Sequence, residues 1–406
     1  MDTKTYRRKL PQGLSSFAKL RELKCLYVDK TEIIWNLVNC DSYINYLSRP
    51  RRFGKTMLVD TLQCYFEGRK ELFEGLKINN YEKEWKQYPV IRLDMSNAGA
   101  SAESLKSFFD REFQYLESKY DITIKETDSL TVRFNSIIKK AYQDTKNRVV
   151  ILIDEYDCPL QHSWHTPEHE KCTAIYRDVF AVLKSADAYE RFVFITGITK
   201  FTQISLFSVL NNLNNISFLP NYAEICGISK QELLDNFQPE IQLLANKFKC
   251  SYDNAVLKLK ENYDGYHFSD ENMTDMFNPF SLINALANQK ISNYWIASGA
   301  TSMIYKFVTD LDINIDKYDN YLIERDTLES SDVSCGDNGL FLYQTGYLTI
   351  KSFDDDVFIL GFPNKEVRKA LYKFVLPSLT MRAQNIVSSE QTQLIYNLKQ
   401  ANIPEH

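Results

Sequence analysis

The sequence of 406 residues contains no apolar run that approaches the roughly 18 residues needed by a membrane-spanning helix. No hydrophobic stretch follows the basic residues Arg7, Arg8 and Lys9, so we expect no secretory signal peptide. The eight cysteines include no Cys-x-x-Cys pair, which argues against a zinc ribbon and against a disulfide scaffold. We therefore expect reduced cysteines and a cytoplasmic location.

The sequence also lacks an excess of positive charge. Lys and Arg total 48 against 53 Asp and Glu, a formal net charge of −5, so the charge does not support direct binding to nucleic acid. Hydrophobic residues make up 44% and charged residues 25%, which is typical of a globular protein and not of a disordered chain. The length is that of two or three domains.

Apolar runs alternate with amphipathic segments in the first half of the chain, a pattern typical of parallel strands covered by helices. The run at 149–153 is continuously apolar, which indicates a central strand buried on both faces. Strands are expected at 43–47, 90–94, 149–153 and 191–196. Helices are expected at 57–67, 102–120, 130–145 and 174–186.

The pattern changes after about residue 222. Ser-Lys-Gln-Glu at 229–232 is a capping box, and apolar residues follow at helical spacing over 233–244. A further helix is expected at 252–262, and Asn278-Pro279 marks the start of another. The region 223–310 is therefore expected to be helical.

The last part of the chain has a different pattern again. Apolar runs at 347–350 and 357–360 flank three aspartates at 354–356, which predicts a β-hairpin. Asn364 is expected to cap a helix over 365–376. Helices combined with a hairpin suggest a small winged-helix-like domain.

The stretch Ser-Arg-Pro-Arg-Arg-Phe-Gly-Lys-Thr at 48–56 lies between a predicted strand and a predicted helix. In a P-loop, backbone N–H groups at a helix N-terminus bind phosphates, a lysine reaches the outer phosphates and a hydroxyl holds Mg²⁺. Arg49 stands where the usual pattern has its first glycine, and a solvated basic turn is the alternative interpretation. The residues expected to bind ATP are Arg51, Arg52, Phe53, Gly54, Lys55, Thr56 and Met57.

Two carboxylates follow the apolar strand at 149–153. We expect Asp154 to hold Mg²⁺ together with Thr56, and Glu155 to orient the attacking water. Lys55 would stabilise charge on the reacting phosphates. A polar turn at the end of a strand is the alternative interpretation of these carboxylates.

The strand at 191–196 ends in Thr196, a candidate polar sensor of the nucleotide with a catalytic role. An ordinary strand-to-loop threonine is an equally good interpretation. Together these features predict an α/β fold with a P-loop NTPase parallel sheet covered by helices at 1–222, followed by a helical, lid-like region at 223–310 and a winged-helix-like α+β domain at 311–406.

With these motifs, the chain resembles the bacterial AAA-ATPase-like family, which consists of P-loop ATPases of the AAA/STAND type. The loop of that family likewise lacks the first glycine. Relatives often continue into a C-terminal PD-(D/E)XK nuclease, whose Asp and Glu-x-Lys motif we do not find downstream, so we expect no nuclease activity. The segments that carry the resemblance are Tyr27–Thr31, Leu47–Thr56, Phe66–Gly68, Ile153–Pro159, Thr196–Gly197, Tyr263–Phe268, Asn278–Leu282 and Leu342–Thr349.

The resemblance implies an ATP-binding, Mg²⁺-dependent ATPase that couples nucleotide state to a partner or effector. Two alternatives remain: a nucleotide-dependent switch or scaffold with negligible hydrolysis, and an accessory module of a nucleic-acid-processing system. The expected partners are ATP and either a protein effector or further copies of the chain, with no membrane.

Two details have competing interpretations. Arg49, like its neighbours Arg51 and Arg52, would reach the phosphates or the acidic surface of a neighbouring subunit. Asp29, Lys30 and Thr31 would either lie near the base or ribose of the nucleotide or cap the helix that starts at about Glu32, because Asp and Thr are preferred at a cap.

Overall fold

A five-stranded parallel sheet lies at the centre of the first half of the chain, with the strand order β2–β3–β4–β1–β5. The computed structural model describes residues 8–125, 127–200, 213–297, 315–330 and 336–380. The predicted parallel sheet is thus confirmed, with one short strand more than expected. The strands are β1 (Ile44–Ser48), β2 (Val90–Asp94), β3 (Val149–Asp154), β4 (Glu190–Gly197) and β5 (Asn214–Asn215).

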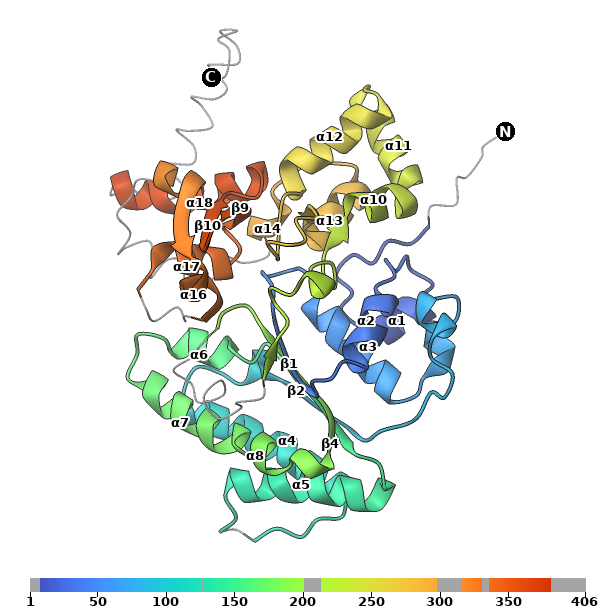
Figure 1. Ribbon diagram of the computed structural model, residues 1–406, viewed down its shortest axis with the longest axis vertical. Helices are drawn as coiled ribbons and strands as arrows, with labels where there is room; N and C mark the ends of the chain where they lie inside the picture. The colour runs from blue at the N-terminus through green and yellow to red at the C-terminus, as the bar shows by residue number, and fades with distance from the viewer. Residues whose placement is uncertain (1–7, 126, 201–212, 298–314, 331–335, 381–406) are drawn as a thin grey trace.

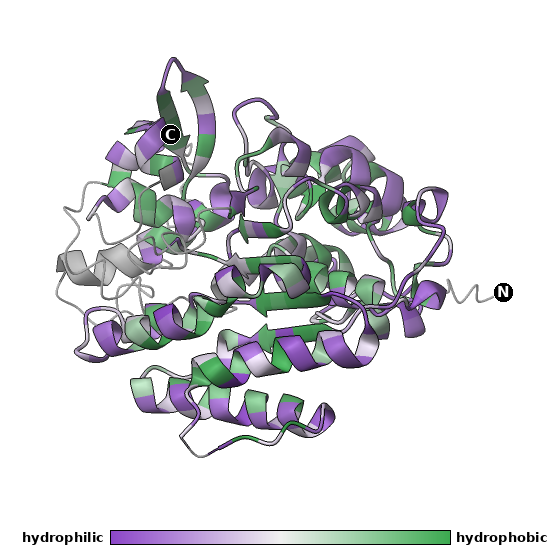
Figure 2. Cartoon of the chain, turned by 60° about the horizontal axis from the view of Figure 1, so that its bottom comes forward, coloured by the Kyte–Doolittle hydropathy of each residue, from purple (hydrophilic) through white to green (hydrophobic). Residues whose placement is uncertain are grey.

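Helices cover both faces of this sheet, with α1–α3 on one side and α4, α5, α7 and α8 on the other (Figure 1). Figure 2 shows the apolar strands enclosed by helices whose outer faces are largely hydrophilic. The helices are α1 (Phe17–Glu22), α2 (Thr31–Val38), α3 (Lys55–Phe66), α4 (Ala102–Lys119), α5 (Leu130–Thr145), α6 (Cys158–Ser163), α7 (Glu168–Phe180) and α8 (Val182–Ser185). Single 3₁₀ turns are η1 (Lys70–Phe73), η2 (Lys77–Asn80), η3 (Met95–Asn97), η4 (Asp187–Tyr189) and η5 (Pro220–Tyr222).

The strand order brings the polar strand ends to one edge. β4 lies between β1 and β3, and all three run parallel, so their carboxyl ends share that edge. Ser48 at the end of β1 is in register with Gly197, and Asp154 at the end of β3 is in register with Asp94 of β2. The loop after β1 and the carboxylates after β3 therefore lie at the same edge, with the end of β4 between them.

The helical region has an apolar core of its own, separate from the core around the sheet. The predicted capping box is present, because Ser229 Oγ accepts from Glu232 N while the Glu232 carboxylate accepts from Ser229 N. One helix predicted here is in fact two, since Phe237 leaves the helical conformation and Pro239 begins a new first turn. The elements are β6 (Ile228–Ser229), α10 (Lys230–Asn236), α11 (Gln238–Phe248), α12 (Tyr252–Tyr263), β7 (Met276–Phe277), α13 (Pro279–Asn288) and α14 (Tyr294–Ala297).

The C-terminal region contains the predicted hairpin, to which a third strand adds in the order β8–β10–β9. The predicted cap is present, because Val367 N donates to Asn364 Oδ1. Parts of the predicted regions, at 298–314, 331–335 and 381–406, lie outside the described residues, and the domain boundaries stay predictions. The elements are η6 (Ile315–Asn320), β8 (Tyr321–Glu324), α16 (Arg325–Ser330), α17 (Asn338–Gln344), β9 (Thr349–Asp354), β10 (Val357–Gly361) and α18 (Lys365–Thr380).

The C-terminal region shares one continuous apolar cluster with the sheet and its helices, a cluster that extends from Phe17 to Leu371. Trp164 of the first half packs against Phe341 of α17, with ring centroids 5.8 Å apart. Across the described ranges, no helix combines the length and the apolar character that crossing a membrane requires.

Asp29 lies one residue before Lys30, the N-cap residue of α2, and binds the first residue of that helix, which favours a role at the helix start. Its Oδ1 accepts from Thr31 N at 2.9 Å and from Thr31 Oγ1 at 2.6 Å, and its Oδ2 accepts from Lys77 N. Lys30, between them, pairs with the Glu232 carboxylate at 2.6 Å and so joins the first half of the chain to the helical region.

Glu190, the first residue of β4, makes the stability of this fold depend on pH. It is 2% exposed, and neither carboxylate oxygen has a hydrogen-bond partner among the described residues. Burial raises the pKa of Glu190 to about 8, and Asp187 adds to the rise. In the unfolded chain the carboxyl has its ordinary pKa of 4.5. Between these two values the folded state binds the extra proton.

We therefore expect the contribution of Glu190 to the free energy of unfolding to be lost as pH rises from about 4.5 to about 8, by up to roughly 1.4 kcal/mol per pH unit. Glu190→Gln should remove this contribution and make stability fall less steeply with pH, whereas Glu103→Gln, at an exposed position of α4, should keep the parent's profile. Urea denaturation across this pH range measures the effect. Parallel pH profiles for the parent and Glu190→Gln would contradict the prediction.

Candidate nucleotide-binding site

The phosphate loop, residues 49–54, joins β1 to α3 and leaves the first turn of α3 open. Gly54 is the N-cap residue of α3 with φ +93, and no side chain caps the helix. Nothing lies within 4 Å of the place where a Cβ would sit on Gly54. The free N–H groups of this helix end are therefore accessible to an anion, as at other anion-binding helix N-termini.

Lys55 lies at the start of α3 and is 5% exposed. Its Nζ donates to two carbonyl oxygens of the loop, those of Arg49 at 2.9 Å and Pro50 at 3.1 Å. Burial lowers the pKa of Lys55, and the carboxylates of Glu155, Asp157 and Asp154 oppose that shift. Three carboxylates at and just after the end of β3 thus lie close enough to the loop lysine to favour its charged form.

Asp154 ends β3 in an environment that is both buried and unsatisfied. Its side chain is 1% exposed, and neither oxygen has a hydrogen-bond partner among the described residues. Burial raises the pKa of Asp154 to about 6, against the effect of the nearby Thr56 side chain. The closest cation recorded is Arg92 of β2, whose Nη2 is 3.9 Å from Asp154 Oδ2. Unsatisfied carboxylate oxygens next to a hydroxyl are a suitable donor set for a hard divalent cation.

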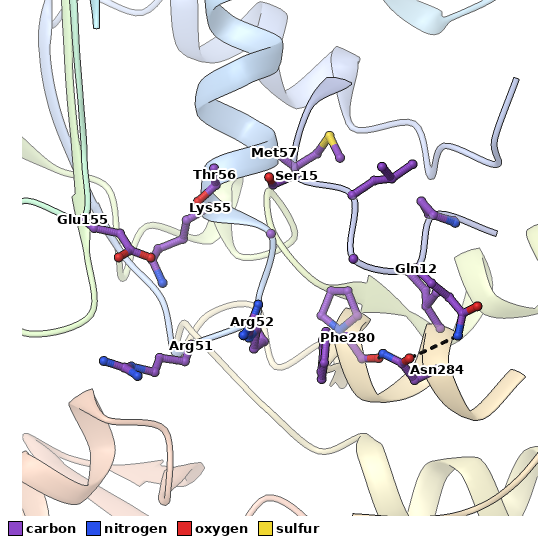
Figure 3. Close-up of a pocket in the computed structure, with 16 residues that line it drawn as sticks. Gln12, Ser15, Arg51, Arg52, Lys55, Thr56, Met57, Glu155, Phe280 and Asn284 are labelled. Atoms are coloured by element: carbon purple, nitrogen blue, oxygen red, sulfur yellow. Dashed lines mark hydrogen bonds between the residues drawn. The ribbon is translucent and has the colours of Figure 1, made fainter. Parts of the chain in front are cut away.

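Glu155 follows with a left-handed backbone, φ +50, which is uncommon for a residue with a side chain. This conformation directs Glu155 into the same cavity as Lys55, and Figure 3 shows the two side chains next to each other. Strained backbone of this kind is concentrated at functional sites.

The cavity has a volume of about 430 Å³ and two different walls (Figure 3). One wall is the phosphate loop with the start of α3. The other consists of residues 11–15, which we call the N-terminal strap, and of α13, whose Phe280 ring lies 4.8 Å below the Arg52 guanidinium. Gln12 of the strap donates to Asn284 of α13 at 3.2 Å, so the two parts of that wall meet.

Most predicted site residues are brought together by this cavity. Those that line it are Arg51, Arg52, Gly54, Lys55, Thr56, Met57 and Glu155. Asp154 lies beside them, close enough to influence Lys55. The assignments of ATP-binding, metal-binding and catalytic roles stay predictions.

Three predicted residues are placed differently. Phe53 is 1% exposed and packs against the rings of Tyr266 and Phe268, and it lines the apolar pocket beside the cavity rather than the cavity itself. Thr196 is fully buried, and its hydroxyl donates to Leu47 O at 2.8 Å. Arg49 is buried and turned into the protein, so the expectation that its side chain reaches the phosphates is wrong.

The second wall could not be recognised from the sequence. The signal nearest to it was Asn278-Pro279, correctly predicted as a helix start, because Asn278 Oδ1 accepts from Ser281 N. That motif predicts where α13 begins but not that it faces the phosphate loop.

Asp60 of α3 binds the residues that directly follow the N-terminal strap and so holds that end of the strap in place. Its Oδ2 accepts from Ser16 Oγ at 3.1 Å and from Phe17 N at 2.6 Å, where the strap enters α1. Its Oδ1 accepts from Arg92 Nη1 at 2.8 Å. Asp60 therefore connects the end of the strap, α3 and β2, the strand that pairs with β3.

A loop between a parallel strand and an open helix N-terminus, with a lysine near acidic residues at the carboxyl end of another strand of the same sheet, defines the P-loop NTPase class. Residues 11–207 match the AAA-ATPase-like family, whose description is "Predicted AAA-ATPase". The resemblance seen in the motifs is therefore confirmed for that segment, which contains the strands β1–β4, the phosphate loop and the strap.

One relative matches along nearly the whole chain. It is an uncharacterized protein in the vnfD 5′ region of Azotobacter chroococcum mcd 1, 29% identical over 403 residues, which are 98% of this chain and 75% of that protein. Among solved structures, Cdc6p from Pyrobaculum aerophilum matches with a TM-score of 0.30 and 10% identity, over 93% of this chain and 97% of that one. The ORC2 protein from Aeropyrum pernix matches with a TM-score of 0.31 and 11% identity, over 92% and 97%. At these TM-scores the solved structures add nothing to the fold assignment.

Because its hydrogen bonds join three elements, we expect Asp60→Ala to lower the free energy of unfolding by about 1–3 kcal/mol. It should also speed hydrogen exchange at residues 11–18. Asp144→Ala, which breaks an exposed pair with Lys140, is the matched control and should cost less than about 0.5 kcal/mol. Urea denaturation and hydrogen-exchange mass spectrometry test both variants, and equal losses in the two would disprove the anchoring role of Asp60.

Proposed function

We propose that this chain binds ATP with Mg²⁺ in the cavity beside the phosphate loop and hydrolyses it. The observation that carries the proposal is the meeting of Lys55, at the open end of α3, with Asp154 and Glu155, at the end of β3. Lysine, helix N-terminus and paired carboxylates at one sheet edge are the parts that a P-loop ATPase requires.

In this proposal the cationic wall of the cavity binds the triphosphate. Arg51, Arg52 and Lys55 line it together with the free N–H groups of α3. On binding, the phosphates would take over Lys55 from the two loop carbonyls that hold it now. Glu155, on the same side, would accept a proton from the attacking water or orient it.

The residues present also suit Mg²⁺. Thr56 and Asp154 would hold it, because the two buried Asp154 oxygens accept no hydrogen bond among the described residues and a carboxylate is a preferred ligand of this ion. The ion would offset the negative charge of the phosphates during their transfer.

A second, apolar pocket next to the cavity would take the base. It has a volume of about 140 Å³ and shares Gly54, Met57 and Pro279 with the cavity. Its remaining lining includes Tyr27, Phe53 and Ile228, mostly apolar side chains that would bury a flat ring system. Lys30, whose amine is paired with Glu232, is its charged member.

The alternative of a nucleotide-dependent switch with negligible hydrolysis is favoured by one observation. The Thr196 hydroxyl, expected to sense the nucleotide, donates to Leu47 O inside the sheet. A site with a phosphate-binding lysine but without that sensor would bind nucleotide and turn over slowly. Phosphate release by the parent protein distinguishes the two candidates.

Lys55→Ala should abolish tight MgATP binding or lower turnover by about 10²–10³-fold, because it removes a charge that stabilises the phosphates. Calorimetric titration with MgATP and a steady-state phosphate-release assay measure the two effects. Lys70→Ala, at an exposed position outside the site, should behave like the parent. Parent-like hydrolysis by Lys55→Ala would mean that this cavity is not the ATPase site.

Glu155→Gln should leave MgATP affinity within about threefold of the parent and reduce phosphate release by about 10²–10⁴-fold, the range of a general base. The amide keeps the shape of the side chain but cannot accept the proton. Slow release by both the parent and Glu155→Gln, with tight binding by both, would support the switch and remove hydrolysis from the proposal.

A further inference from the structure

Arg49 is the residue that replaces the first glycine of the usual P-loop, and it is among the largest fully buried side chains of the protein. It is 2% exposed and points away from the cavity. Its recorded partners are carbonyl oxygens and an aromatic ring rather than carboxylates. Burying a guanidinium without a carboxylate partner costs desolvation free energy, which its hydrogen bonds must offset. We therefore ask what function this buried charge serves.

Hydrogen bonds along the edges of the Arg49 guanidinium and an aromatic ring against one of its faces hold it in place. Nη1 donates to Ser48 O at 2.9 Å and to Ser217 O at 2.8 Å, and Nη2 donates to Tyr222 O at 2.9 Å. Its Cζ lies 4.1 Å from the centroid of the Phe268 ring. This arrangement needs a planar group with several donors, which arginine has and lysine lacks.

The main chain of Arg49 is held as well. Its N–H donates to Gly197 O at the end of β4, and its carbonyl accepts from Lys55 Nζ at 2.9 Å. Because side chain and N–H are both bonded, the carbonyl that holds Lys55 has a fixed position. A glycine here would leave this first residue of the loop free to rotate.

The surface that supports the loop comes from the second half of the chain. We call Tyr266 and Phe268 the aromatic shelf, because both rings pack edge-on against Phe53 of the loop, with centroids 4.7 and 5.3 Å away. Tyr266 donates its hydroxyl to Gly346 O, and a Cβ on Gly346 would lie 2.6 Å from Pro50 Cβ. The loop is thus packed against the shelf on one side and the turn after α17 on another.

The bonding of Arg49 also leaves a net positive charge behind the loop. Burial lowers the pKa of Arg49 to about 10, so the guanidinium stays charged at neutral pH. A charge in a poorly solvated place acts on nearby anions more strongly than one in water. Its sign favours a bound triphosphate.

We propose that Arg49 is a positioning residue of the nucleotide site and that Phe268 is the surface that holds it in place. Arg49 fixes the start of the phosphate loop, and through its carbonyl it fixes the place from which Lys55 is delivered to the phosphates. The inference deepens the proposed function, on which it rests. Affinity for nucleotide at the loop then depends on a contact with the second half of the chain.

The test compares variants that separately remove the charge of Arg49, the planar shape of its guanidinium and the aromatic ring of Phe268. Arg49→Lys keeps the charge without the planar fork, and Arg49→Met keeps the length without the charge. Phe268→Leu removes the ring face, whereas Phe268→Tyr retains it. Arg191→Lys is the matched control. Arg191 lies at the other end of β4, where it likewise donates to a carbonyl oxygen, that of Val38, and lies over an aromatic ring, that of Tyr88.

Calorimetric titration with MgATP gives Kd, phosphate release gives KM and kcat, and thermal unfolding gives Tm for each variant. We expect Kd and KM to rise about tenfold in Arg49→Lys and Phe268→Leu, and further in Arg49→Met. Values for kcat should change less than Kd, since the loop still forms once nucleotide is bound. Phe268→Tyr and Arg191→Lys should bind within about twofold of the parent.

A merely structural role predicts another result. The proposal is overturned if Arg49→Lys and Phe268→Leu have a lower Tm than the parent but the same Kd, measured at a temperature well below the Tm of each variant. Should Arg49→Met fail to fold, Arg49→Lys and the pair of Phe268 variants still decide the question. A parent protein that binds no MgATP would instead overturn the proposed function, so the two failures differ.

Discussion

Two opposite charges, Lys55 and Asp154, are buried at the carboxyl edge of the sheet, and neither has an oppositely charged group at hydrogen-bond distance among the described residues. The lysine uses main-chain carbonyls of its own loop, and the aspartate has no hydrogen bond among the described residues. Desolvation lowers the pKa of Lys55 and raises that of Asp154 to about 6, because burial disfavours the charged form of each group. A ligand that carries phosphate and a divalent cation would relieve both at once.

The rest of the structure keeps these charges where they are. The strand order places the two loops at one edge, and Asp60 connects the phosphate helix to the strap and to Arg92. On the far side of the cavity, α13 belongs to the helical region, so a ligand in the cavity would contact two parts of the fold. Lys30 and Glu232 already join those parts across the neighbouring pocket.

The sequence was a good guide to what depends on local pattern. The strands predicted at 90–94 and 149–153 were found with at most one residue added, because continuous apolar runs are a strong signal for buried parallel strands. The helix over 130–145 matches α5 at both ends, helped by the Ser129 cap. That Lys55, Thr56 and Glu155 line one cavity followed from residue types next to predicted strand ends.

What depends on tertiary contact was not predictable. β5 and β6 are two residues long and have no pattern of their own. The N-terminal strap and Phe280 reach the cavity only through the packing of distant segments. Arg49 carries no local sign that its side chain turns inward, since exposed and buried arginines look alike in a sequence. The same holds for Thr196, whose hydroxyl is used within the sheet.

The apolar cluster that extends from Phe17 to Leu371 has a practical consequence for dividing the protein. The segment that matches the family ends at residue 207, yet Phe341 from far downstream packs against Trp164, and Tyr343 and Leu348 line a pocket together with Arg49 and Ile198. A recombinant fragment that ends near residue 207 would expose a large apolar surface to solvent. Such a fragment would self-associate or precipitate, so any excised version needs the C-terminal helices and hairpin retained.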